Sequence, residues 1–485
     1  MIVARMEGDA LRIIDRHREM VRLADGLDNR HMLSDEARWR ALGCLGRFGQ
    51  RLRHLDSRDV RAVGTNTFRA ADNATEFLDQ AEQALGHPID IISGVEEARL
   101  IYSGVAHSLK KQDVRRLVVD IGGGSTEVIL GKGLETYNMH SFYMGCVSMS
   151  QRYFRDGVID EQRMREAELA AKQELEPVEH EFHQADWDQA LGASGTVKSA
   201  ARIAFENGWC EEESVISKRG LKQIRKSLIE AGHLDKVKLK GLVEKRLPVV
   251  CGGVAILRAV FSVLEIDEMR VSKGALREGL LYDLAGRLQH HDVRDQSVGL
   301  LAERCKVDDA QAQRVRQMAM MLYAQVADDW KLADESLAQM LGWAALLHEC
   351  GMMVAYNQYH KHGAYVISHA SLDGFSQQEQ LFLAVLVRAH RRKFPLSEVK
   401  ALPPRWSRQA LRLAILLRIA VTLNRGRTDI GLQQFVASVS KNSIELVLPP
   451  DWLDFHPLTK ADLALEAEYL ASIGYSLTVS APTDS

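Results

Sequence analysis

An acidic residue on each side of three consecutive glycines is the feature of this chain that points most directly to phosphate chemistry. The segment reads Asp120, Ile121, Gly122, Gly123, Gly124, Ser125, Thr126 and Glu127. Glycines lack a Cβ and let backbone N–H groups approach an anion from several directions. Carboxylate oxygens are ligands that Mg²⁺ prefers. The pattern therefore predicts a cradle for a phosphate chain with its Mg²⁺, and the alternative is a glycine turn whose acids are incidental.

The residues around the glycines predict a β-hairpin. Apolar runs at 117–119 and 128–130 flank the segment. A Rossmann loop would need a helix after G-x-G-x-x-G, whereas residues 126–130 are rich in strand formers. A P-loop would need a lysine after the glycines, and none follows. We therefore expect the glycines at the tip of a buried hairpin.

Two other segments have the composition of anion-binding loops. Residues 192–196 are small and lie between a predicted strand and a predicted helix. Arg69 follows two threonines ahead of a predicted helix at 74–85. The first turn of a helix and a nearby cation both favour an anion. The alternatives are a tight strand-to-helix turn for the first segment and an ordinary helix cap for the second.

A pair of adjacent glutamates begins another predicted helix. Ser93 and Glu96 have the spacing of a capping box, S-x-x-E. The capping box gives Glu96 a structural role, and it gives none to Glu97, the next residue. Adjacent glutamates are typical of a solvated helix start, and a catalytic carboxylate at Glu97 is the alternative.

Composition and charge limit the classes to which the protein could belong. The chain has 485 residues, 46% of them hydrophobic and 26% charged, and a net charge of −3. Several domains are therefore possible, and the overall charge predicts no nucleic acid partner. Six cysteines without a C-x-x-C motif predict reduced thiols in a cytoplasmic protein. Because two arginines interrupt the apolar run at 411–423, we expect no membrane-spanning segment.

The Asp-x-Gly-Gly-Gly-Ser-Thr-Glu hairpin resembles a phosphate motif of the exopolyphosphatase/guanosine pentaphosphate phosphohydrolase family, in the superfamily of actin and the sugar kinases. The resemblance covers nearly the whole chain. It implies an α/β fold with two actin-like (ribonuclease H-like) lobes at 1–101 and 102–288. An all-α HD-like domain at 289–428 and a small α+β domain at 429–485 would follow.

The resemblance also assigns roles to particular residues. Glu97 would orient and deprotonate the attacking water, and Asp120 and Glu127 would hold Mg²⁺. The phosphate-binding residues would be Arg69, Gly122, Gly123, Gly124, Ser125, Ser194, Gly195, Thr196 and Arg277.

The expected activity is that of an exopolyphosphatase, which releases terminal phosphate from inorganic polyphosphate. Guanosine pentaphosphate is the alternative substrate, and a catalytically impaired phosphate-chain-binding protein is the alternative class. A homodimer in the cytoplasm is implied by the resemblance, with the inner-membrane surface as an alternative location.

Basic residues outside the hairpin could extend the site. The segment 218–246 is rich in lysine and arginine, which predicts a solvated helical face or, alternatively, a polyanion track. In the HD-like region, His348 and Glu349 stand where an HD metal site would have His-Asp, so a degenerate domain is favoured over a metal site. A polyphosphate tail could dock on the densest basic run, at Arg388, Arg391, Arg392 and Lys393.

The beginning of the chain departs from the family pattern. Residues 1–5 and 11–14 predict two strands around a turn at Gly8 and Asp9. The family places an apolar strand and an Asp-x-Gly-Ser-Asn turn before this hairpin, and the sequence has neither. The resemblance therefore implies weak activity for a chain that begins at Met1 and an upstream reading that contains the motif.

Overall fold

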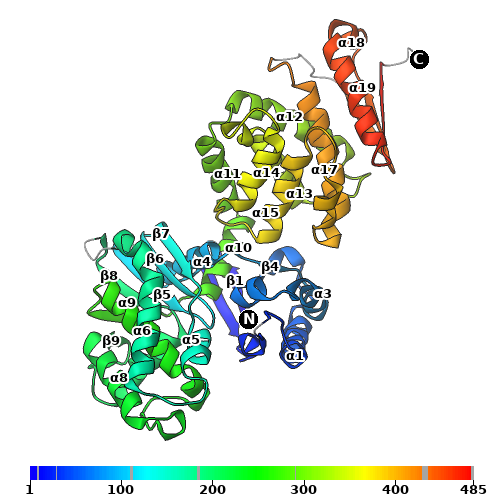
Figure 1. Cartoon of the computed structure of the whole chain (residues 1–485). Helices are drawn as coiled ribbons and strands as arrows, with labels where there is room; N and C mark the ends of the chain where they lie inside the picture. The colour runs from blue at the N-terminus through cyan, green and yellow to red at the C-terminus, as the bar shows by residue number, and fades with distance from the viewer. Residues whose placement is uncertain are drawn as a thin grey trace. The chain divides into compact units, whose positions relative to one another are not determined.

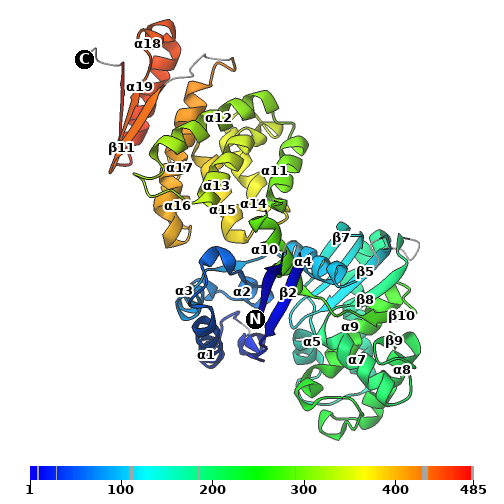
Figure 2. The same cartoon turned by 180° about the vertical axis from the view of Figure 1, so that it is seen from behind.

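The computed structural model divides into two compact units, Met1–Asp292 and Val293–Ser485. It describes residues 1–7, 10–28, 30–109, 113–182, 186–289, 291–428 and 435–481. The predicted turn at Gly8 and Asp9 lies outside these residues. Figures 1 and 2 show the chain from opposite sides.

The glycine segment forms the predicted hairpin at the centre of a six-stranded sheet in the first unit. Its strands, β5 (Arg115–Ile121) and β6 (Thr126–Lys132), pair in antiparallel register with Val118 opposite Ile129. Strand order in the sheet is β7-β6-β5-β8-β10-β9, and β8 runs parallel to β5. Figure 1 shows β5, β6 and β7 side by side. The remaining strands are β7 (Glu135–Phe142), β8 (Gln189–Gly192), β9 (Val215–Ser217) and β10 (Glu268–Val271).

Helices cover both faces of this sheet. Side chains alternate along β5, so that Leu117 and Val119 join one hydrophobic core and Val118 joins another. The second core contains Ile101 and Tyr102 of α4 (Gly94–His107). The helices of the first core are α5 (Cys146–Tyr153), α6 (Glu161–Leu175), α7 (Gly195–Glu206), α8 (Lys218–Ala231) and α9 (Val250–Val263).

One segment of the described chain, Glu244–Val263, is long and apolar enough to cross a membrane, with a mean hydropathy of 1.7. It joins a 3₁₀ helix, Glu244–Val249, to α9. Because 61% of its apolar window is buried inside the protein, α9 is a core helix that packs against the sheet.

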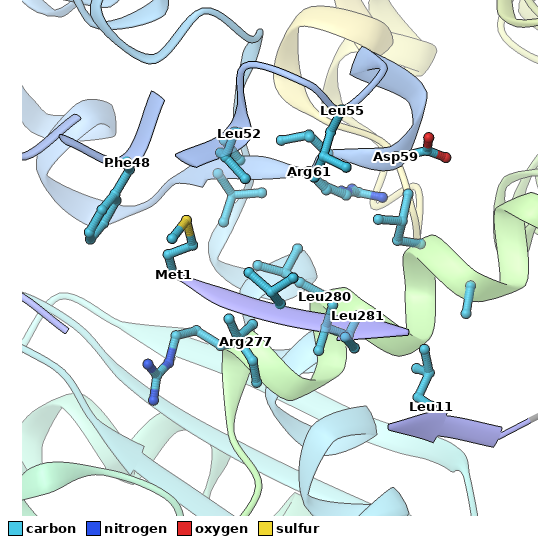
Figure 3. A pocket seen from close by; sticks show the side chains of 18 of the residues that line it. Met1, Leu11, Phe48, Leu52, Leu55, Asp59, Arg61, Arg277, Leu280 and Leu281 are labelled. Carbon is cyan, nitrogen blue, oxygen red and sulfur yellow. The ribbon is translucent and has the colours of Figure 1, made fainter. Parts of the chain in front are cut away.

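The N-terminal strands form two separate pairs. β1 (Ile2–Glu7) and β2 (Ala10–Arg16) are antiparallel, and β3 (Ala62–Gly64) and β4 (Ile89–Ile91) are parallel. A cavity of about 670 Å³, shown in Figure 3, lies beside β1 and β3. The helices of this part are α1 (Asp35–Leu52), α2 (Asn66–Ala70) and α3 (Ala74–Leu85), with 3₁₀ turns at Leu23–Gly26 and Ser57–Asp59.

Helix α4 and helix α10 (Leu276–Leu288) touch backbone to backbone. A Cβ added at Gly279 would lie 1.8 Å from the carbonyl oxygen of Leu100, and one added at Gly104 would lie 2.1 Å from that of Ala275. No side chain larger than hydrogen fits at either position. The two glycines therefore fix how closely these helices cross.

The second unit is mainly helical and ends in a three-stranded sheet of order β11-β12-β13. One hydrophobic core includes Leu322 and Leu416 of the helices together with Leu446 of the sheet. The helices are α11 (Val293–Arg304), α12 (Asp309–Val326), α13 (Glu335–Leu347), α14 (Tyr359–His369), α15 (Gln377–Ala389), α16 (Leu396–Lys400), α17 (Pro404–Leu423), α18 (Trp452–Phe455) and α19 (Pro457–Ala471). The strands are β11 (Val436–Ser440), β12 (Ser443–Val447) and β13 (Ser476–Ser480).

Candidate active site

The tip of the β5–β6 hairpin is held in place by its own backbone and by α5. The N–H of Gly122 donates to the carbonyl of Ser125 at 2.8 Å, which closes the turn. The carbonyls of Gly122 and Gly123 accept from the first amides of α5, both at 2.9 Å. The Gly122 N–H is therefore used within the turn, and a role for Gly122 in phosphate binding stays a prediction. Among the described residues, the amides of Gly123 and Gly124 donate to no protein acceptor.

Three carboxylates gather behind the tip. Asp120 and Glu127 lie opposite each other in the hairpin register. Glu97, in the first turn of α4, is close enough that its charge raises the pKa of both. Burial is the larger cause: it raises the pKa of Asp120 to about 7 and that of Glu127 well above its usual value. The structure thus joins two acids of one hairpin to a third acid from a different element.

Glu97 has a cationic partner. Nη1 of Arg69 lies 3.2 Å from Oε2 of Glu97 and also donates to the carbonyl of Ile92 at 2.8 Å. Burial raises the pKa of Glu97, and Arg69 and a hydrogen bond from Thr65 oppose that rise. Arg69 lies in the short helix α2, which the sequence analysis did not anticipate, and the structure places it against the carboxylate.

Glu127 is enclosed by hydroxyl groups. Its Oε1 accepts a hydrogen bond of 2.8 Å from Oγ of Ser141 on β7, and Ser125 is a second hydroxyl partner. Only 1% of Glu127 is exposed. A direct metal ligand must contact the ion. Because hydroxyl groups enclose the Glu127 carboxylate, contact with a metal through water is favoured over direct coordination.

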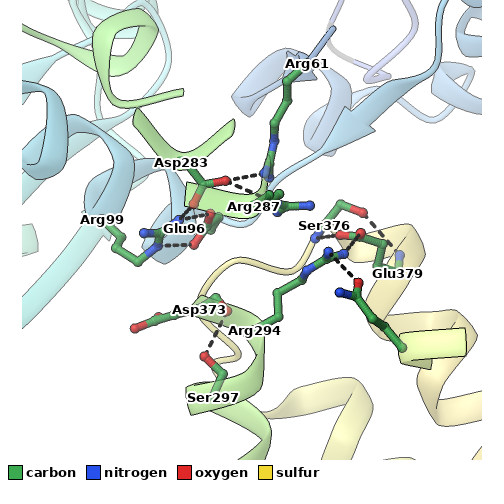
Figure 4. Close-up of polar contacts among 11 residues, drawn as sticks. Arg61, Glu96, Arg99, Asp283, Arg287, Arg294, Ser297, Asp373, Ser376 and Glu379 are labelled. Atoms are coloured by element: carbon green, nitrogen blue, oxygen red, sulfur yellow. Dashed lines mark hydrogen bonds and ion pairs between the residues drawn. The ribbon is translucent and has the colours of Figure 1, made fainter. Parts of the chain in front are cut away.

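Glu96 belongs to a buried network of charges. Oγ of Ser93 accepts from the Glu96 amide at 3.1 Å, which is one half of the predicted capping box. The Glu96 carboxylate, however, forms two hydrogen bonds of 2.8 Å with Arg99, which also binds Asp283 of α10. Figure 4 shows Asp283 contacted in addition by Arg61 and Arg287. The network ties α4 to α10 and to the start of β3.

The second predicted loop lies directly beside the hairpin. Oγ of Ser194 accepts from the amides of Thr196 and Val197, both at 3.2 Å, so Ser194 is the N-cap of α7. The hydroxyl of Thr196 donates to the carbonyl of Ile121 at 3.2 Å. This bond fastens the loop to the end of β5, so the two glycine-containing segments form one surface.

Arg246 is a site residue that the sequence analysis did not single out. A Cβ added at Gly195 would lie 1.8 Å from Nη2 of Arg246, so the guanidinium rests on the backbone of the loop. The sequence analysis placed Arg246 only within a basic region. Its neighbour in space, Gly195, is far away in the chain, and no local pattern connects the two.

A cavity of about 890 Å³ opens onto both loops. Asp120, Gly122, Gly123, Ser194 and Gly195 line it, together with Arg277. The other predicted residues of the first unit are absent from its described lining: Arg69, Glu97, Gly124, Ser125, Thr196 and Glu127.

The cavity wall is basic, although the chain as a whole is slightly acidic. Nine arginine and lysine residues line it against four acids. The cations are Arg16, Arg18, Arg22, Arg155, Lys198, Lys245, Arg246, Lys273 and Arg277. Such a local concentration of positive charge attracts polyanions independently of the net charge. Part of the same wall is apolar, with Val147, Phe154, Leu234, Pro248 and Val249.

In the second unit, the predicted residues form no metal centre. Among the described residues of the chain, no group of three or more His, Cys, Asp or Glu side chains is arranged to hold a metal ion. Nε2 of His348 lies 3.9 Å from Glu349, whose carboxylate pairs instead with Arg427. Whether this HD-like region binds a metal stays a prediction.

The basic run of the second unit is only partly exposed. Arg388 is near Glu398, with 3.9 Å between Nε and Oε1, and Arg391 stacks over the Tyr359 ring. Arg392 and Lys393 are exposed. The role of this basic run in binding a polyphosphate tail stays a prediction.

Comparison with known proteins gives a consistent result. Residues 2–288 match the Ppx/GppA phosphatase family, and residues 293–467 match domain III of Ppx/GppA phosphatases. A protein of Aeromonas hydrophila named guanosine-5'-triphosphate,3'-diphosphate pyrophosphatase is 37% identical over 475 residues, 98% of this chain and 95% of that protein. A protein of Vibrio vulnificus with the same name is 37% identical over 480 residues, 99% of this chain and 95% of that protein.

Solved structures support the fold. An exopolyphosphatase-like protein aligns with a TM-score of 0.53 and 24% identity, over 59% of this chain and 94% of that one. An exopolyphosphatase from Cytophaga hutchinsonii aligns with a TM-score of 0.52 and 24% identity over the same shares. The expected fold class, α/β with actin-like lobes followed by a helical domain, is confirmed.

Proposed function

Because the chain belongs to the Ppx/GppA phosphatase family, we propose that it hydrolyses the terminal 5′ phosphoanhydride bond of guanosine-5′-triphosphate,3′-diphosphate. The sequence predicts a phosphoanhydride hydrolase, and membership of this family confirms that class of enzyme. Inorganic polyphosphate was the first substrate expected. The names of the relatives at 37% identity support the guanosine alternative better.

The observation that carries the substrate choice is the mixed character of the 890 Å³ cavity. A polyphosphate chain offers only charged oxygens, whereas a guanosine nucleotide also has a base with apolar faces. The cations can hold the phosphates, and the apolar wall formed by Val147, Phe154 and Val249 can contact the base. A cavity of this size is typical of a small-molecule site.

The reaction needs positioning more than covalent chemistry. In our proposal the oxygen of a water attacks the terminal phosphorus, and the bond from that phosphorus to the bridging oxygen breaks. Glu97 accepts the proton of the water, and its raised pKa brings it nearer to neutral pH, where a general base works best. The products are inorganic phosphate and the guanosine bisdiphosphate.

Donors around the cavity would hold the phosphate oxygens. In our proposal the amides of Gly123 and Gly124, which donate to no acceptor among the described residues, would stabilise the charge that develops on the transferred group. Arg246, which rests on the Gly195 loop, and Arg277 would add charge-assisted hydrogen bonds. Arg69 would be a further cation near the phosphate, and it also orients the carboxylate of Glu97.

The donor set around Asp120 fits Mg²⁺. Asp120 lines the cavity, no described side chain or amide donates to its carboxylate, and burial raises its pKa to about 7. A carboxylate of this kind suits Mg²⁺, which usually takes one or two protein ligands and completes its shell with water and phosphate. Glu127 would act through water. When bound, Mg²⁺ would neutralise charge on the phosphate oxygens.

A side-by-side assay tests the proposed substrate. Phosphate release from guanosine-5′-triphosphate,3′-diphosphate, GTP and long-chain polyphosphate should be measured at equal phosphate concentration, with Mg²⁺ and with chelator. We expect the highest kcat/KM for guanosine-5′-triphosphate,3′-diphosphate. We expect no phosphate release from it when chelator removes Mg²⁺. A higher kcat/KM for polyphosphate would overturn the substrate choice while leaving the site intact.

The homodimer and the cytoplasmic location are part of the same proposal. Both are implied by the sequence resemblance alone and stay predictions. Light scattering of the purified chain measures the first, and cell fractionation measures the second.

A further inference from the structure

A cavity of about 300 Å³ is formed only by residues of the second unit. Helices α12, α14, α17 and α19 contribute to its walls, together with the residues that follow α13 and α15. The proposed reaction uses none of these residues. The volume is at the lower end of the range for small-molecule sites, roughly 300–1,000 Å³.

His390, which lines this cavity directly after α15, has an unused hydrogen-bonding atom. Its Nδ1 lies 2.6 Å from the carbonyl oxygen of Val387, and a carbonyl can only accept, so Nδ1 carries the ring proton. Nε2 is buried and has no hydrogen-bond partner among the described residues. Only 2% of His390 is exposed. Burial, and after it the neighbouring His348, lowers the pKa of His390 well below its usual value, so the ring is neutral and Nε2 is an acceptor.

A buried acceptor without a donor is unfavourable, because the nitrogen has lost its hydrogen bond to water. Water or a ligand with an O–H or N–H group would restore that bond. The charges around the cavity indicate which kind of ligand fits.

The cavity has more cations than its acids neutralise. Four arginines and three acids are among its described lining residues. Each acid already has an arginine partner: Glu349 has Arg427, Asp462 has Arg425, and Glu466 has Arg418. Arg391 and Arg392 form no ion pair with a described carboxylate, and Arg391 stacks over the Tyr359 ring at 4.5 Å. Two unpaired cations therefore follow His390 directly in the chain.

The end of α15 does not cancel this positive charge. The last carbonyls of a helix carry partial negative charge and repel anions. Here the carbonyl of Ala389 accepts from Nη1 of the buried Arg418 at 2.6 Å, and that of Val387 accepts from His390. These carbonyls are thus neutralised within the protein, and Arg391 and Arg392 stay available to an anion.

We propose that this cavity binds a singly protonated phosphate group, either as inorganic phosphate or as a small phosphate monoester. Arg391 and Arg392 would hold the charged oxygens, and the phosphate O–H would donate to Nε2 of His390. Sulfate has the same shape but carries no proton near neutral pH. The inner units of a polyphosphate chain carry none either, so neither anion would satisfy the histidine.

Hydrogen exchange of the full-length protein over residues 386–393 and 420–427 tests the proposal, because these segments line the cavity. The probes are inorganic phosphate, glycerol phosphate and sulfate, titrated at about pH 6, near the last pKa of a phosphate monoester. Arg392→Gln removes an exposed cation, and His390→Leu removes the acceptor. Lys400→Gln is the control, since this exposed residue of α16 is absent from the described lining.

We expect phosphate to slow exchange in both segments, and sulfate to require a concentration about tenfold higher or more, because a site built around an acceptor rejects a ligand without a donor. Arg392→Gln should raise the phosphate Kd by about tenfold or more, and Lys400→Gln should leave it unchanged. His390→Leu should abolish the preference for phosphate over sulfate. Stronger protection by glycerol phosphate than by phosphate would identify the ligand as a monoester, and the reverse would identify it as inorganic phosphate.

Three results would overturn the proposal. The first is unchanged exchange in both segments at millimolar phosphate. The second is equal protection by sulfate and phosphate. The third is protection that persists in Arg392→Gln, which would place the bound phosphate elsewhere in the chain. If His390→Leu does not fold, the sulfate comparison and Arg392→Gln decide.

Discussion

Nη1 of Arg69 lies between Oε2 of Glu97, at 3.2 Å, and the carbonyl oxygen of Ile92, at 2.8 Å. One cation from the short helix α2 therefore orients the carboxylate in the first turn of α4. A phosphate that drew Arg69 away would leave Glu97 with less neutralisation and a higher pKa. Base strength and substrate binding are thus connected through a single guanidinium group.

Replacing Glu97 by glutamine should lower kcat by about 10²–10⁴, the usual loss when a general base is removed. KM should change little, because glutamine has the same shape and can still accept from Arg69. Steady-state kinetics on the preferred substrate measures both. Glu36→Gln, an exposed acid in the first turn of α1, is the matched control. A Glu97→Gln protein as active as the parent would exclude Glu97 as the base.

The neighbouring substitution Glu96→Gln should act on stability instead of chemistry. The Glu96 carboxylate is 1% exposed and bound to Arg99, which also binds Asp283. Removing one charge from a buried network leaves the others uncompensated, so we expect a loss of about 2–4 kcal/mol in the free energy of unfolding. Urea denaturation measures it. A loss below about 1 kcal/mol, the value of a helix cap alone, would contradict this account.

Asp120 should make the metal-free protein less stable as the pH rises. Its pKa is about 7 in the folded protein, against 3.8 for an unperturbed aspartate, so the folded state holds the proton more tightly. The contribution of this proton to the free energy of unfolding is complete below about pH 4, and it is lost as the pH rises through about 7. Asp120→Asn should therefore stabilise the metal-free protein at pH 8 by on the order of 2–4 kcal/mol and abolish activity.

Urea denaturation at pH 5, 6, 7 and 8, in chelator, measures this effect. Asp235→Asn, an exposed acid, is the control and should leave the pH dependence unchanged. Mg²⁺ should raise the stability of the parent and not that of Asp120→Asn, because only a ligand that binds the folded state stabilises it. Equal gains for both proteins would place the metal elsewhere.

Arg246 should contribute to substrate binding. Arg246→Gln should raise KM about tenfold or more, with a smaller change in kcat, since a charge-assisted hydrogen bond to phosphate is lost. Gly195→Ala should do the same without a change of charge, because the added methyl group would displace the guanidinium. Lys226→Gln, on the exposed face of α8, is the control. A KM that responds to Arg246→Gln and not to Gly195→Ala would argue that the contact between the two is unimportant.

The basic run of the second unit should matter only for long substrates. Replacing Arg391, Arg392 and Lys393 together by alanine should weaken long polyphosphate more than short chains, and should leave the guanosine substrate unaffected. The effect should shrink at high salt, where exposed charges are screened. Competition assays with chains of defined length measure it. Equal losses for all lengths would contradict a tail-docking role.

The parts of the site that the sequence predicted are those encoded by local patterns. Apolar runs around three glycines predicted the hairpin of β5 and β6, and small residues between a strand and a helix predicted the loop at the start of α7. The contact of Arg246 with Gly195 and the ion pair of Arg99 with Asp283 join residues far apart in the chain. No spacing encodes such contacts, because they depend on how the elements pack.

The glycine contact between α4 and α10 determines how the two halves of the first unit can move. With the backbone of Gly279 pressed against the carbonyl of Leu100, a slide along the helices would bring larger side chains into a space that accepts only hydrogen. We therefore expect the cleft to open for product release by rotation about this contact. Leu100 lies one helical turn after Glu97 on α4, so such a rotation would move the phosphate-binding walls more than the proposed proton acceptor.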